Sequence, residues 1–73
     1  METEYALANH KRITDRLSCR IDEQMQMVPT ASTPILLAIL EAKVDLLLSL
    51  GIRPKAVRKL HAKLYLLKAE VQP

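Results

Sequence analysis

The chain has 73 residues and is basic, with 11 Lys and Arg against 8 Asp and Glu. Its single cysteine, Cys19, excludes an internal disulfide, and its only aromatic residues, Tyr5 and Tyr65, give no platform for stacking single-stranded nucleic-acid bases. Hydrophobic residues still make up 49% of the chain, so residues 1–73 are expected to form one small domain with an aliphatic core.

The first predicted element is a helix over residues 4–27. Pro29 disfavours helical geometry at Val28 and so ends the pattern. On the polar side, Arg12, Arg16 and Arg20 are spaced by four and share one face, which could bind phosphate or an acidic partner. Acidic residues are mixed with them, however, and this pattern favours a solvated surface. We expect Cys19 to be a small buried or half-buried residue. The apolar side covers an arc of about 120° and consists of Leu7, Ile13, Leu17, Ile21 and Met25.

The second predicted element is a helix over residues 34–50, with Thr33 as its cap and Pro34 in its first turn. Its aliphatic arc spans about 220°, which is more than one neighbouring helix can cover. The helix is therefore expected to be central and to contact both other helices and a second copy or a partner. Lys43 lies on this arc, where its stem can pack while its ammonium reaches water.

The same segment is too short and too charged to cross a membrane, since it carries Glu41, Lys43 and Asp45. No signal-peptide pattern precedes the first helix. A soluble, cytoplasmic protein is expected.

Gly51 is the only glycine and is placed to end the second helix in a left-handed conformation, with Ile52 folding back on the helix. Pro54 then opens a third helix over residues 54–71. Outside its seam, Tyr65 and Leu66 widen the apolar surface. The seam has the three-four spacing of a coiled coil and consists of Val57, Leu60, Leu64, Leu67 and Val71.

No constellation for catalysis or for a metal is apparent. The two histidines lie on different predicted helices, away from any cluster of Cys or carboxylates at metal-ligand spacing. Asp22 and Glu23 are adjacent, so they point in different directions on a helix. We expect neither an enzyme nor a cofactor, and no catalytic residue is assigned.

Residues 49–64, SLGIRPKAVRKLHAKL, resemble the helix-turn-helix of DNA-binding proteins, loosely that of the factor-for-inversion-stimulation type. The resemblance implies that Gly51 makes the turn and that Ile52, Val57 and Leu60 lock the helices. It also implies that Arg53, Lys55, Arg58 and Lys59 face DNA. The charge pattern adds Lys63 to these possible DNA contacts. The same string is also typical of a simple antiparallel helical corner.

Two functions follow from these features. The first is a small regulatory or interaction protein, an adaptor, inhibitor or chaperone, that forms a homodimer and binds another protein. The alternative is a DNA-binding regulator that uses the basic helix 54–71. For the first function, the predicted interface consists of Leu36, Leu40, Lys43, Leu47, Leu64, Tyr65, Leu66 and Leu67.

Overall fold

The computed structural model describes residues 2–71, with side chains from residue 4 onward, and contains three helices and no strand in that range. They are α1 (Glu2–Gln26), α2 (Thr33–Ser49) and α3 (Pro54–Val71). The expected all-α, three-helix unit is confirmed, and each helix begins and ends within two residues of its predicted position.

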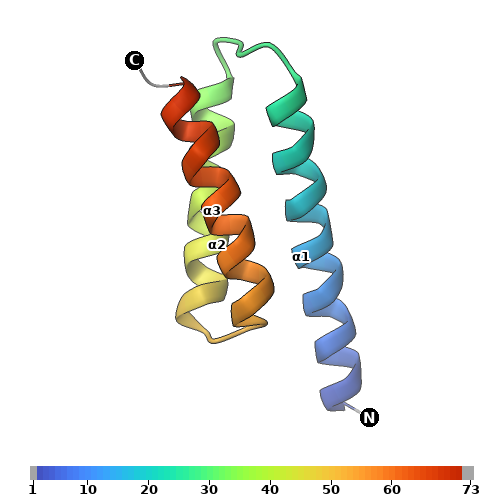
Figure 1. The fold of residues 1–73 in the computed structure, drawn as a ribbon. Helices are drawn as coiled ribbons and strands as arrows, with labels where there is room; N and C mark the ends of the chain where they lie inside the picture. The colour runs from blue at the N-terminus through green and yellow to red at the C-terminus, as the bar shows by residue number, and fades with distance from the viewer. Residues whose placement is uncertain (1, 72–73) are drawn as a thin grey trace.

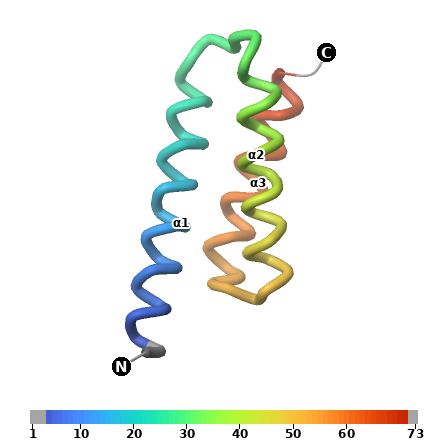
Figure 2. The backbone as a smooth tube through the Cα atoms, turned by 180° about the vertical axis from the view of Figure 1, so that it is seen from behind, coloured from blue at the N-terminus to red at the C-terminus, as the bar shows by residue number. Residues whose placement is uncertain are grey.

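The helices lie side by side in an elongated bundle of 46 × 18 × 17 Å (Figure 1). α2 and α3 form an antiparallel pair, and α1 runs along that pair (Figure 2). At 1.5 Å per residue, the 25 residues of α1 extend about 37 Å, roughly 10 Å more than either other helix. The start of α1 consequently projects beyond the α2–α3 corner (Figure 1). Across the described residues, no helix combines the length and the apolar character that a membrane crossing requires.

The corner between α2 and α3 has the geometry expected from its glycine. Gly51 has φ +69°, and its N–H donates to the carbonyl of Leu48 at 3.0 Å. The N–H of Ile52 donates to the carbonyl of Leu47 at 3.1 Å, and the Ile52 side chain packs against the core. These two bonds and the apolar contact form a Schellman motif, which satisfies carbonyls that a helix end leaves open.

Arg53 follows this motif and also has a positive φ, of 44°. A non-glycine residue seldom adopts this conformation, and the following Pro54 disfavours the ordinary helical one. The guanidinium reaches back to α1, where Nη1 lies 3.5 Å from the carbonyl oxygen of Lys11 and 3.9 Å from Oδ1 of Asp15. Arg53 therefore connects the corner to the middle of α1.

The core lies mainly between α2 and α3. The predicted seam of α3 is confirmed, because its first four residues are buried and Val71 is partly buried against them. α1 adds only Leu17 and Ile21 to the buried apolar cluster. From the hairpin, the cluster contains Leu37, Leu40, Val44 and Leu47 of α2 and Val57, Leu60, Leu64 and Leu67 of α3.

The apolar face predicted for α1 was too wide. Leu7, Ile13 and Met25 are exposed, whereas Thr14 is buried beside Leu17 and Ile21. The Thr14 hydroxyl donates to the carbonyl of His10 at 2.8 Å, so its burial leaves no polar group without a partner. Leu7 precedes by one turn Lys11, which Arg53 of the corner contacts, so it lies beyond the end of the hairpin and is exposed.

Two smaller expectations were also wrong. Cys19 is exposed rather than buried or half-buried. Thr33 does not cap α2, because the helix begins at Thr33 and Ser32 takes the cap position, where its side chain makes no capping hydrogen bond to the helix. The buried hydroxyl of Thr33 instead accepts the N–H of Thr30 at 2.8 Å and so fixes the loop before the helix.

Candidate protein-interaction site

The side of α2 that faces away from the core carries large aliphatic residues in contact with water. We call Ile35, Ile39, Leu46 and Leu50 the apolar stripe; their side chains are 66%, 48%, 58% and 62% exposed. At 100° per residue they fall within about 60° of one another, opposite Val44. Leu36 and Leu48 are partly buried at the two edges of the core.

A groove of about 630 Å³ runs between α1 and α2, next to the apolar stripe. Figure 2 shows this side of the bundle, where the second half of α3 lies behind α2 and its first half is seen between α1 and α2. α1 contributes Ile13, Arg16, Leu17 and Arg20 to the lining. α2 contributes Leu36, Ile39, Leu40, Lys43, Leu46 and Leu47.

The expectation that α2 is the central helix was wrong, because α3 packs on both other helices. α1 packs on α3 more extensively than on α2, and this leaves the groove between α1 and α2. The ion pairs likewise connect α3 to each of the other two helices. Lys63 Nζ lies 3.1 Å from Asp22 Oδ1 and joins α3 to α1, while Lys68 pairs with Glu41 and joins α3 to α2. Within the described part of the chain, no ion pair joins α1 to α2. The side of the bundle between these two helices is therefore its most open side.

The charge of the groove has one sign. Arg16 and Arg20 line it from α1 and Lys43 lines it from α2, and no carboxylate is among the lining residues. None of these three cations has an ion-pair partner among the residues that the structure describes. Glu23 follows Arg20 by one turn of α1 but does not line the groove. An apolar floor with basic walls can bind an amphipathic group that carries negative charge.

The predicted interface residues divide between core and surface. Lys43, Tyr65 and Leu66 are exposed and Leu36 is partly buried. Tyr65 and Leu66 are adjacent, so they point to different sides of α3 and do not form one patch. The other four are at most 6% exposed and belong to the core: Leu40, Leu47, Leu64 and Leu67.

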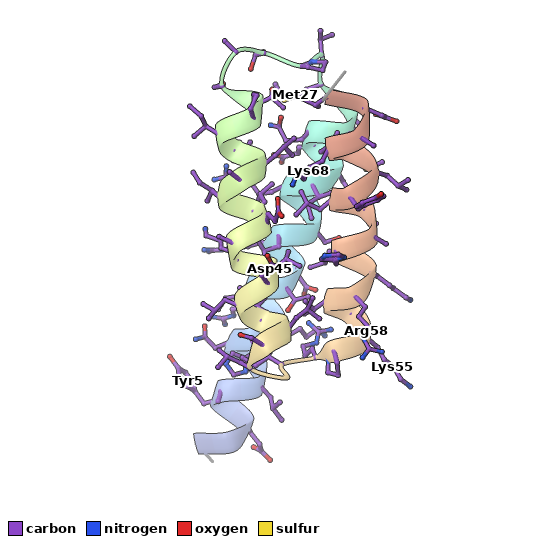
Figure 3. All side chains as sticks on the ribbon, turned by 90° about the vertical axis from the view of Figure 1, so that its left-hand side faces the viewer. Tyr5, Met27, Asp45, Lys55, Arg58 and Lys68 are labelled. Atoms are coloured by element: carbon purple, nitrogen blue, oxygen red, sulfur yellow. The ribbon has the colours of Figure 1, made fainter. Side chains whose placement is uncertain are left out.

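The basic residues predicted to face DNA also divide. Arg53 and Lys63 are partly buried and paired with carboxylates of α1. Lys55, Arg58 and Lys59 are exposed on α3, and Figure 3 shows Lys55 and Arg58 at the outer edge of the hairpin near its corner. The antiparallel alignment of α2 and α3 (Figures 1 and 2) differs from the crossing of about 90–120° in a helix-turn-helix.

The predicted interface omitted most of the surface just described. The apolar stripe was within the wide aliphatic arc, but an arc alone does not say which part the neighbouring helices cover. Arg16 and Arg20 were assigned to a solvated face, because their position beside α2 depends on how α1 is rotated in the bundle. The sequence did contain a sign of the stripe: Ile35, Ile39, Ala42 and Leu46 follow one another at intervals of three or four residues and so share one face of the helix.

Among the side chains of residues 4–71, no three from His, Cys, Asp or Glu are grouped so that they could hold a metal ion. Comparison with protein-family models, curated proteins and solved structures finds no match to this chain.

Proposed function

We propose that this protein is a small helical interaction and regulatory module, which binds another protein and self-associates through the exposed face of α2. The observation that carries the proposal is the apolar stripe, four large aliphatic side chains that are each about half exposed or more. Burying such surface is worth about 25 cal/mol per Å², so its cover by a partner or a second copy is favourable. Contiguous apolar surface of this kind is typical of interaction sites.

Substitutions on two faces of α2 test this proposal. Leu46→Glu places a charge in the apolar stripe, whereas Ala38→Glu places the same charge at an exposed position outside it. We expect sedimentation equilibrium over a wide range of concentrations to show self-association of the wild type and of Ala38→Glu, but not of Leu46→Glu. Equal self-association of all three proteins would contradict the role of the stripe. A wild type that remains monomeric throughout would remove self-association from the proposal.

DNA binding by α3 is the second candidate. Lys55, Arg58 and Lys59 are exposed, and they have no ion-pair partner among the described residues. Cations near the start of a helix do not stabilise it, because that end of the helix dipole is positive. Their position is better suited to a negatively charged partner such as the phosphate backbone.

Titration of duplex DNA at two salt concentrations tests this second candidate. If these three residues each contact one phosphate, affinity should fall about 40-fold for a fourfold rise in salt. Replacing the three by Gln should remove both the binding and its salt dependence. Absence of binding at low salt would exclude this use of α3.

A further inference from the structure

We infer that the groove between α1 and α2 binds one amphipathic helix of another protein, with an apolar side against the floor and acidic residues along its edges. The inference rests on the proposed interaction function and names the class of partner. Such a helix would occupy the fourth corner of a four-helix bundle, where the present three helices leave one side uncovered.

The shape of the groove favours a helix. Its floor includes Leu17, Leu40 and Leu47, which are at most 6% exposed and lie between two helices. Above them, Ile39 and Leu46 are about half exposed and continue the apolar surface outward. Side chains at three-four spacing on a docked helix can reach into such a groove. A flat membrane surface would contact Ile39 and Leu46 rather than this floor, because the floor residues are almost fully buried.

The charge of the groove specifies the edges of the partner helix. Arg16 and Arg20 stand on the α1 side and Lys43 on the α2 side, and the lining residues contain no acid. Glu or Asp on both edges of the docked helix would meet cations that have no partner in the free protein. A partner with Lys or Arg at those positions would be repelled, so the groove selects by charge as well as by apolar contact.

The same charges disfavour a second copy in the groove. A two-fold dimer brings identical surfaces together, so the three cations of one groove would face the same three in the other. Self-association through the apolar stripe does not require this arrangement. A partner helix in the groove would, however, cover Ile39 and Leu46 of the stripe. Binding of the partner should therefore compete with self-association.

A peptide selection with matched variants tests the inference. The groove variant combines Arg16→Glu, Arg20→Glu and Lys43→Glu. The control variant combines Lys55→Glu, Arg58→Glu and Lys59→Glu on the outer side of α3. Each variant changes the formal charge from +3 to −3, since three reversals remove six units (3 − 6 = −3), so net charge alone cannot distinguish them. Circular dichroism checks that both are folded, and Gln in place of Glu gives a milder groove variant.

The probe is a displayed library of helical peptides as long as α2, with Leu fixed at three-four spacing and Glu, Lys, Gln or Ala at the other positions. Wild type and control variant should enrich Glu beside the Leu positions, and the groove variant should enrich Lys. A peptide selected on the wild type should bind the groove variant about tenfold more weakly, and the control variant with little change. Added salt should reduce this difference.

Three results would overturn the inference. The first is selection of the same peptides by wild type and groove variant. The second is no enrichment on the wild type over a blank surface. The third is binding to phosphatidylglycerol vesicles that the groove variant loses while no peptide is enriched, which would assign the groove to a membrane surface. If any of these occurs while Leu46→Glu still abolishes self-association, only the binding of an acidic helix in the groove is excluded, and self-association through the apolar stripe stands. If self-association is also absent, the proposed function fails with it.

Discussion

Two adjacent leucines of α2 give the sharpest test of how this small bundle is held together. Leu47 is 6% exposed and lies in the core, whereas Leu46 is 58% exposed and lies in the apolar stripe. Both are replaced by Ala, so the chemistry, the helix and the position along its axis are nearly the same. Only the side of the helix differs.

The expected losses of stability differ several-fold. Leu47→Ala removes buried methyl groups and leaves a cavity, which costs about 2–5 kcal/mol. Leu46 hides only 42% of its surface (100 − 58 = 42). Full burial of a leucine is worth about 1.5–3 kcal/mol, so Leu46→Ala should cost about 1 kcal/mol, from which the better helix propensity of Ala subtracts a few tenths. A domain of this size has a total stability of roughly 4–11 kcal/mol.

Urea unfolding followed by circular dichroism measures both losses. The free energy of unfolding falls by about 1–3 kcal/mol per M urea, so a loss of about 3 kcal/mol lowers the midpoint of unfolding by about 1 M or more. At the upper end of the expected loss, Leu47→Ala would be unfolded even without urea. Leu46→Ala should remain close to the wild type when the protein is dilute. Equal losses for the two variants under dilute conditions would refute the assignment of core and surface on α2.

Three further outcomes are expected, each measured by urea unfolding. Gly51→Ala should lower the free energy of unfolding by about 1 kcal/mol, because an added Cβ meets no atom within 4 Å and only the positive φ is unfavourable. Gly51→Asn should lower it less. Equal stability of the wild type and both variants would contradict the left-handed conformation at Gly51. Thr33→Val should lose about 1 kcal/mol, because the N–H of Thr30 loses its acceptor, and a neutral effect would show that this bond does not hold the loop. Lys68→Met should lower the free energy of unfolding by less than about 1 kcal/mol, because the ion pair with Glu41 is about one-third exposed and water screens it. A loss of several kcal/mol would contradict this minor role of the ion pair.

Local signals in the sequence determined where the helices lie. Pro29 ends α1, Gly51 ends α2 and Pro54 begins α3, and each acts through its own backbone geometry without a distant partner. The seam of α3 also follows from sequence, since its three-four spacing leaves one apolar face to bury. These features depend on residues close together in the chain, which is why the pattern was sufficient.

The tertiary structure alone decided which apolar residues remain exposed. The wide aliphatic arc of α2 predicted contacts with more than one neighbour but did not say which residues make them. Ile39 faces water while the adjacent Leu40 faces the core, and Leu46 and Leu47 differ in the same way. That choice depends on how α2 is rotated toward α3. The groove depends in addition on how α1 leans toward α3, which brings Arg16 and Arg20 beside Lys43. Rotation and tilt are set by the packing of whole helices against one another, and no short stretch of sequence contains them.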